Sequence, residues 1–199
     1  MNNKNQETCK LLIEHGHPYD YPKSNFKDTA LCCALKNRLY DIVNFLIDNN
    51  VRLNYQHNPF KNTPLSYAIH TKNESIIEKI INKGVKVDYP NVSFKLTPLY
   101  KSIVYKLNRI SLLLINKGVR INYKQNIFEN TPLYFSIKNE LEDVSLLLIS
   151  KGVRVRYNNI QDHNKTVLSV ATYYGPPSVV NALVEKGCLK DLLYVIDHN

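Results

Sequence analysis

Several residue types that often carry structure or chemistry are scarce in this chain of 199 residues. Trp is absent, Met occurs once, Gly six times and Cys four times. No apolar run approaches the roughly 20 residues that a membrane-spanning helix needs. The opening stretch, Met1 to Lys10, is polar, and no apolar segment of a secretory signal follows it. These absences favour an intracellular protein, cytoplasmic or nuclear, that does not enter a membrane.

The residues that would support catalysis or metal binding are present but not in suitable patterns. Cys9, Cys32, Cys33 and Cys188 lack metal-type spacing, so we expect reduced cysteines that serve in packing. The six histidines lack zinc-protease spacing, and neither a Gly-rich phosphate loop nor a Gly-x-Ser-x-Gly elbow occurs. We therefore predict no enzyme, no metal and no cofactor.

What the chain does have is a repeat. One three-residue signal returns five times, with spacings of 34, 34, 34 and 35 residues, as Thr29-Ala30-Leu31, Thr63-Pro64-Leu65, Thr97-Pro98-Leu99, Thr131-Pro132-Leu133 and Thr166-Val167-Leu168. Glycines keep the same period at Gly16, Gly84, Gly118, Gly152 and Gly187, and Asn50 holds the place of a missing one. A repeat of this length predicts an array whose neighbours bury each other's apolar faces.

The stretch from Asn62 to Asp88 predicts the structure of one repeat. Thr63 can cap a helix, Pro64 suits the first helical position, and apolar residues at helical spacing follow, so a first helix is expected over about 64–71. A second apolar stripe runs to Gly84, which fits a left-handed helix end. Residues 85–89 then alternate like a strand or extended arm.

This order of two helices, glycine, arm and Thr-Pro-Leu resembles the ankyrin-repeat family. A small residue follows each Leu of the signal by three positions, at Ala34, Ala68, Ser102, Ser136 and Ala171, and an aliphatic pair marks the second helix, as in Ile80-Ile81. The resemblance implies an all-α fold, an ankyrin-repeat solenoid of helix-turn-helix units with extended hairpin arms. The tetratricopeptide class has the same period but no use for the Thr-Pro-Leu opening.

The resemblance also implies a domain organisation. We expect a single ankyrin-repeat domain over 1–199, with full repeats whose helices lie at about 29–50, 63–84, 97–118, 131–152 and 166–187. Residues 1–16 read as half a repeat, which leaves an apolar edge at Leu11, Leu12 and Ile13. Residues 188–199 read as a short closing helix.

Departures from the family pattern recur with the period. Tyrosines form one column in the arms at Tyr21, Tyr55, Tyr89, Tyr123 and Tyr157, and phenylalanines form another at Phe26, Phe60, Phe94 and Phe128. These aromatics either pack between neighbouring arms or present a rigid surface to a partner. The usual glycine between the two helices survives only as Gly175.

The charge, +9 at neutral pH, is also partly periodic. Lysines just before the glycine, at 83, 117, 151 and 186, complement the negative end of a helix dipole. Arg52, Lys86, Arg120 and Arg154 lie two residues after the glycine position, where the family usually has Asp. This column is either a solvated stripe or an electropositive ladder that faces an acidic protein, and nucleic acid is a weaker alternative.

We therefore expect a non-catalytic interaction module that binds an acidic protein or peptide through its concave face and hairpin arms. The residues expected to contact the partner are Arg52, Lys61, His70, Lys86, Lys95, Tyr105, Arg120, Lys138, Arg154, Tyr173 and Tyr174, and Val104 lies at an equivalent helix end. The alternative is an assembly protein that self-associates through the N-terminal edge. Asn, Lys, Ile and Tyr, whose codons are AT-rich, supply 76 of the residues, which suggests a viral or symbiont effector directed at a host protein.

Overall fold

The computed structural model describes Glu7, Leu11, Glu14 and the ranges 29–54, 63–88, 97–122, 131–155 and 166–188. Each of the five ranges holds one pair of short α-helices, and no described residue is in a β-strand. The chain is all-α, as the sequence predicts.

The chain divides into two compact units, Met1–Val92 (unit 1) and Ser93–Asn199 (unit 2). The helix pairs of unit 1 are α2 (Ala30–Lys36) with α3 (Tyr40–Asp48), and α4 (Pro64–Thr71) with α5 (Glu74–Asn82). Those of unit 2 are α6 (Pro98–Val104) with α7 (Asn108–Asn116), α8 (Pro132–Lys138) with α9 (Glu142–Ser150), and α10 (Val167–Tyr174) with α11 (Pro177–Glu185). These helices lie inside the ranges predicted for the full repeats, whereas the single domain over 1–199 stays a prediction.

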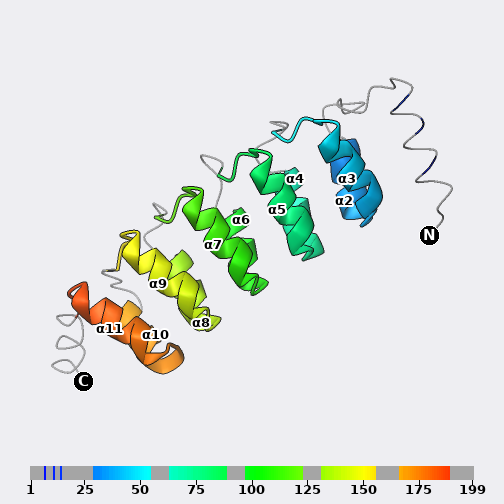
Figure 1. Ribbon diagram of the computed structural model, residues 1–199. Helices are drawn as coiled ribbons and strands as arrows, with labels where there is room; N and C mark the ends of the chain where they lie inside the picture. The colour runs from blue at the N-terminus through cyan, green and yellow to red at the C-terminus, as the bar shows by residue number, and fades with distance from the viewer. Residues whose placement is uncertain are drawn as a thin grey trace. The chain divides into compact units, whose positions relative to one another are not determined.

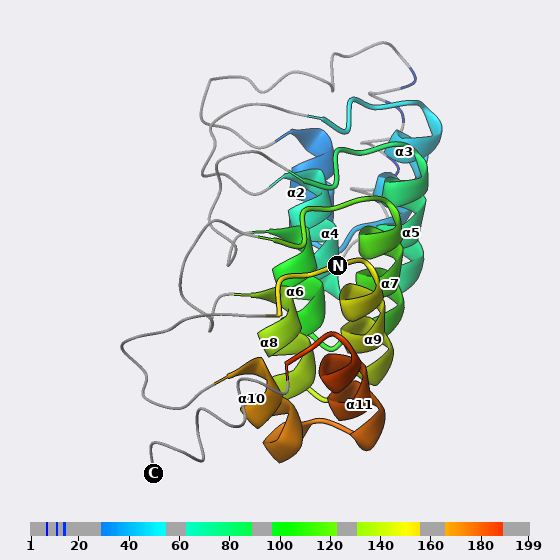
Figure 2. The same ribbon diagram turned by 90° about the vertical axis from the view of Figure 1, so that its left-hand side faces the viewer.

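Within each unit, the first helices of the repeats form one row and the second helices form another (Figure 1). In unit 1, α4 packs on α2 and α5 packs on α3. In unit 2, α8 lies between α6 and α10, and α9 lies between α7 and α11, so that two parallel rows result (Figure 2).

Every first helix begins at a threonine that caps it. The backbone N–H three residues after each Thr donates a hydrogen bond to the Thr Oγ1, over 3.2 Å at Thr29, Thr63, Thr97 and Thr131 and 3.1 Å at Thr166. Such a cap contributes about 1 kcal/mol because it satisfies an N–H that the helix leaves unpaired. The periodic threonine is therefore a helix start, as predicted.

The periodic aliphatic residues form the core. The leucine of each signal is fully buried, as are the leading members of the aliphatic pairs, such as Leu46 and Ile80. Burying one such side chain stabilises the fold by about 1.5–3 kcal/mol. Because every repeat brings the same set, the core continues from one helix pair to the next inside each unit.

The second helices end at the predicted left-handed residue. Gly84, Gly118, Gly152 and Gly187 have φ between 77° and 85°, and Asn50 has φ 56°. In the fourth repeat the Gly152 N–H donates to the Ile149 carbonyl, and the Val153 N–H donates to the Leu148 carbonyl. This pair of bonds satisfies carbonyls at the helix end and turns the chain away from it.

The turns between the two helices of a repeat adopt two conformations. Four of them place a non-glycine residue in the left-handed region, at Arg38, Lys72, Lys106 and Glu140, with φ of 56–60°. Gly175 instead has φ −94° and ψ 157°, so it does not use the freedom of glycine for a positive φ. It is needed for space, because a Cβ there would lie 2.8 Å from the Ala171 carbonyl oxygen.

In the third and the fourth repeat, a buried pair of serines joins the two helices of the repeat. Ser111 Oγ donates to Ser102 Oγ over 2.8 Å, and Ser145 Oγ donates to Ser136 Oγ over 2.9 Å. The Ser102 hydroxyl lies 2.9 Å from the Leu99 carbonyl oxygen, to which it donates. The hydroxyls are thus hydrogen-bonded, which removes most of the cost of burying them.

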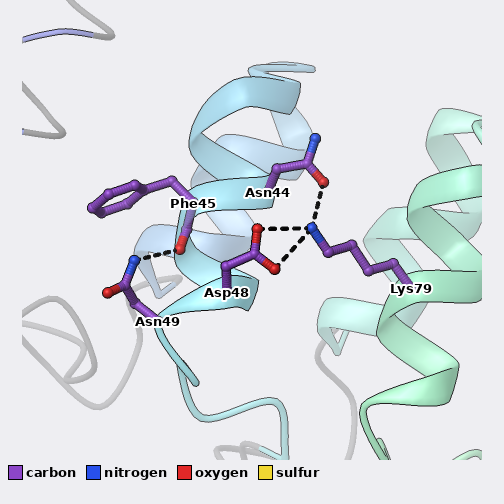
Figure 3. Close-up of polar contacts among 5 residues, drawn as sticks. All are labelled: Asn44, Phe45, Asp48, Asn49 and Lys79. Atoms are coloured by element: carbon purple, nitrogen blue, oxygen red, sulfur yellow. Dashed lines mark hydrogen bonds and ion pairs between the residues drawn. The ribbon is translucent and has the colours of Figure 1, made fainter.

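Polar side chains also join neighbouring second helices. In unit 1, Lys79 of α5 donates to Asn44 Oδ1 and to Asp48 of α3, with an N···O distance of 3.0 Å in each case (Figure 3). In unit 2, Asn108 donates to Asp143 over 3.1 Å, and Ser178 donates to Glu142. Exposed contacts of this kind contribute roughly 1 kcal/mol or less each.

Several predictions concern residues outside the described ranges. These include the Tyr and Phe columns, Cys9, most of the half repeat over 1–16 and the closing helix after Cys188. Glu7, Leu11 and Glu14 are helical and exposed, whereas Leu12 and Ile13 are not described. Residues 85–88 form no strand, so the described part of that arm is not a strand. Cys32 and Cys188 are buried as predicted for packing residues, but Cys33 is exposed.

Candidate protein-binding surface

The two rows of helices carry different charges. The first helices, α2, α4, α6, α8 and α10, contain no Asp or Glu, and their ionisable side chains other than tyrosine and cysteine are Lys36, His70, Lys101 and Lys138. The second helices hold Asp41, Asp48, Glu74, Glu78, Glu142, Asp143 and Glu185. Three of these acids, Asp48, Glu142 and Asp143, are engaged in the contacts between second helices. Within each unit, the row of first helices therefore offers a partner positive charge and contains no carboxylate of its own.

The column of cations after the glycine is held at repeat spacing by asparagines. Arg52, Lys86, Arg120 and Arg154 are all exposed. In unit 1 the Lys86 backbone N–H donates to Asn54 Oδ1 over 2.6 Å, and in unit 2 the Arg154 N–H donates to Asn122 Oδ1 over 2.8 Å. Each asparagine thus fixes the backbone of the next repeat at its cation. Within each unit, this arrangement positions two successive cations for a common partner.

Five of the residues predicted to contact a partner lie at the ends of first helices. His70 and Lys138 are exposed in the last turns of α4 and α8, and Tyr105 is the half-buried C-cap of α6. Tyr173 and Tyr174 end α10 with 80% and 43% of their surface exposed, and their rings meet edge to face at 4.6 Å. Lys61 and Lys95, predicted at arm tips, lie outside the described residues.

An aromatic cluster on α6 and α8 escaped the sequence prediction. Tyr100 of α6 contacts Phe135 of α8 edge to face, with ring centroids 5.0 Å apart, and Phe135 contacts Tyr134 at 5.2 Å. The Lys138 ammonium lies 5.7 Å from the centroid of the Tyr134 ring, a cation–π distance. Tyr100 and Tyr134 stand at the same repeat position, three residues after Thr97 and Thr131, but the position of Phe135 holds Lys101 in α6, so no periodic pattern marked the contact.

Lys101 is the other residue that sequence reasoning missed. It lies in the middle of α6 with only 9% of its surface exposed. Burial lowers the pKa of its ammonium below the ordinary value of 10.5, because a desolvated charge is disfavoured. The column in which it stands holds Cys33, Tyr67, Phe135 and Val170 in the other repeats, so no periodic pattern marked it as charged.

The structure groups the predicted residues within each unit. In unit 2, Tyr105, Lys138 and the Tyr173–Tyr174 pair stand at the ends of three successive first helices, and Arg120 and Arg154 are linked through Asn122. In unit 1, Arg52 and Lys86 are linked through Asn54. Among the described residues no cluster of three metal-binding side chains occurs.

Paired helices that stack in two rows define a helical repeat protein. Residues 104–193 match the family model of ankyrin repeats in three copies. The fold resembles the crystal structure of the human ASB11 ankyrin repeat domain, with a TM-score of 0.60 and 23% sequence identity over 88% of this chain and 75% of that one. No curated protein matches the chain.

Residues 104–193 are therefore ankyrin repeats, and the chain has the fold of an ankyrin-repeat domain. Ankyrin repeats are in general modules for protein–protein interaction, and they are typically not enzymes. Within the described ranges, no helix has the length and apolar character required to cross a membrane.

Proposed function

We propose that this protein is a non-catalytic interaction module that binds an acidic protein or peptide through its first helices and the arms beside them. The observation that carries the proposal is the separation of charge between the two rows. Carboxylates are absent from all five described first helices and present on four of the five second helices. A partner with an acidic surface is attracted to the first-helix side and meets no helical carboxylate there.

The column of Arg52, Lys86, Arg120 and Arg154 supports the same partner chemistry. Its four side chains are exposed, and the family's usual acidic residue at this position is replaced by a cation each time. The asparagine links at Asn54 and Asn122 keep the cations on an ordered backbone. Ordering before binding lowers the entropy that association costs.

The test compares two triple charge reversals with the same change in net charge. In K86E/R120E/R154E the column is reversed, and in K83E/K117E/K151E the lysines that end the second helices are reversed. Tagged wild-type and variant chains are used to capture partners from the native cell, with identification by mass spectrometry. Captured proteins are then purified and their binding measured at several salt concentrations, after circular dichroism confirms folding.

We expect the wild type and the helix-end variant to capture the same acidic partners and the column variant to lose them. Equal capture by all three chains would contradict the electrostatic part of the proposal. A captured nucleic acid, with affinity that falls steeply as salt rises, would replace the protein partner with a polyanion.

The proposal includes a location inside the cell, cytoplasmic or nuclear, and a role as an effector that engages a host protein. Imaging of the tagged chain in the native cell tests the location. Self-association through the N-terminal edge is a separate prediction, because Leu12 and Ile13 of that edge are not described. Sedimentation at high protein concentration distinguishes it, since a monomer would contradict an assembly role.

A further inference from the structure

Three successive first helices of unit 2 end in exposed side chains. Val104, Lys138 and Tyr173 each stand seven residues after the threonine that caps their helix. Val104 is 37% exposed, Lys138 is exposed and Tyr173 is the most exposed large apolar residue among those described. Because α8 packs between α6 and α10, these three residues occur in spatial order across one row (Figure 2).

The cation in the middle of this row, Lys138, lies against a set of packed aromatic rings. The Tyr134 ring lies beneath the Lys138 ammonium and is itself held by Phe135, which contacts Tyr100 on the neighbouring helix. Rings packed edge to face restrict one another, so they provide contact area at low cost in conformational entropy. The middle of the row is thus an oriented positive charge, and its ends are apolar.

The charged side chains of α6, α8 and α10 are all positive. α6, α8 and α10 contain Lys101 and Lys138 and no carboxylate. The turns after α6 and α8 hold Lys106 and Glu140, one charge of each sign, so their contributions offset. A partner segment that places a carboxylate at Lys138 and apolar side chains at Val104 and Tyr173 is complementary to the row.

The equivalent row of unit 1 has different chemistry. The seventh position after the threonine is Lys36 in α2 and His70 in α4, and both residues are exposed. Neither helix ends in an exposed aromatic or aliphatic side chain. The apolar and cationic combination is therefore confined, among the described first helices, to unit 2.

We propose that unit 2 binds an extended acidic peptide that carries apolar side chains on both sides of a carboxylate, across the ends of α6, α8 and α10. Packed helices are about 8–10 Å apart, so three of them span about 20 Å. An extended chain advances about 3.3 Å per residue and points successive side chains to opposite faces, so about seven residues cross the row and every second side chain faces it. This assignment rests on the proposed function, because it names the partner chemistry of the same first-helix surface.

The test uses a fluorescent peptide of about nine residues in an extended register, with leucines about six positions apart and aspartates between them. The pattern is symmetric, so it serves either chain direction. One comparison peptide replaces the leucines with serine, a second replaces the aspartates with asparagine, and a third probe is single-stranded oligothymidylate of similar length. Binding to the full chain is measured by fluorescence anisotropy.

We expect the leucine–aspartate peptide to bind more tightly than all three comparison probes. Lys138→Glu and the double variant Tyr173→Ala/Tyr174→Ala should each weaken it about tenfold or more, as expected for central contacts of an interface. Lys36→Glu, at the same repeat position in unit 1, should change binding less than about twofold. Tyr173→Phe should retain binding, because it keeps the ring and removes only the hydroxyl.

The assignment would be overturned if the wild type bound no peptide. It would also be overturned if the Lys138 and tyrosine variants bound the peptide as tightly as the wild type does. Equal binding of the serine peptide would overturn its apolar part, and tighter binding of oligothymidylate would replace the peptide with a nucleic acid. These outcomes leave the proposed function to its own test. That function fails separately if the column variant captures the same partners as the wild type.

Discussion

Units 1 and 2 fill the same position in the repeat with different chemistry. Five and fourteen residues after the capping threonine, unit 1 has Ala68 and Ile77, whereas the third repeat in unit 2 has Ser102 and Ser111. Both arrangements are buried, but the serines are joined by a hydrogen bond of 2.8 Å. The repeat therefore constrains size and burial at these positions, while either apolar packing or a satisfied hydroxyl pair fills them.

The first-helix surfaces differ in the same way. Unit 1 ends its first helices in Lys36 and His70, and unit 2 ends them in Val104, Lys138 and Tyr173. These side chains are exposed, so we expect substitutions there to leave the fold intact. The comparison teaches that a common scaffold supports two surfaces, of which only the second combines exposed apolar groups with a cation.

The largest expected effect tests whether the cores of units 1 and 2 are equivalent. Leu65→Ala in unit 1 and Leu133→Ala in unit 2 each remove a fully buried side chain at the same repeat position. Each should lower the free energy of unfolding by about 2–5 kcal/mol, because a cavity adds to the lost burial. Urea denaturation followed by circular dichroism measures both, and a large loss of stability for one variant with none for the other would refute the equivalence of the two cores.

The turns between paired helices give the next largest contrast. Gly175→Ala in unit 2 should cost about 1–3 kcal/mol, because its Cβ meets the Ala171 carbonyl oxygen and the backbone must shift. Arg38→Gly in unit 1 should stabilise by up to about 1 kcal/mol, because it relieves a left-handed residue. Thermal unfolding of the two variants should move in opposite directions, and movement in the same direction would contradict the different roles of these turns.

The serine pair sharpens the comparison inside the core. A double-mutant cycle with Ser102→Ala, Ser111→Val and their combination converts the third repeat to the Ala34 and Val43 arrangement of the first. We expect a coupling free energy of about 0.5–1.5 kcal/mol, because either single change removes the same hydrogen bond. Urea denaturation supplies the four free energies. Strict additivity would mean that the pair is two independent side chains.

The smallest expected effect concerns Lys101. Its folded pKa is lowered below 10.5, so the unfolded chain binds more protons between the two pKa values and stability rises with pH through that window. Lys101→Met should remove this rise, whereas Lys36→Met, at an exposed lysine of unit 1, should keep it. Urea denaturation from neutral pH to about pH 9.5, below the usual tyrosine pKa, measures the slope. Equal slopes for the wild type and Lys101→Met would contradict the cause assigned to the shift.

Much of the fold could be predicted because its signals are local. Thr63, Pro64 and Gly84 each act within one helix turn, and the start of α4 and the end of α5 follow from them. Gly175 illustrates the limit of such reasoning. The sequence marked it only as the surviving family glycine between two helices, whereas the contact that requires it is the approach of the Ala171 carbonyl.

The candidate surface was less predictable than the fold. Exposed positions such as Lys138 and Tyr173 follow from helix periodicity, and their residues were predicted as contacts. The Tyr100–Phe135 contact joins two helices that a whole repeat separates in sequence, so no local pattern indicated it. The arm-tip predictions at Lys61 and Lys95 lie outside the described residues and stay predictions.

By itself, the sequence determined where the first helices begin, which aliphatic side chains the repeats bury and where the second helices end, since caps, apolar spacing and left-handed ends act over a few residues. Tertiary structure decided that Ser111 donates a hydrogen bond to Ser102 and that Lys101 is buried. It also decided that Phe135, which contacts the Tyr134 ring beneath Lys138, packs against Tyr100 of the neighbouring helix. These outcomes depend on which side chains meet when helices pack. The repeat fixes that packing geometrically, but the identity of the residues that meet differs from one repeat to the next.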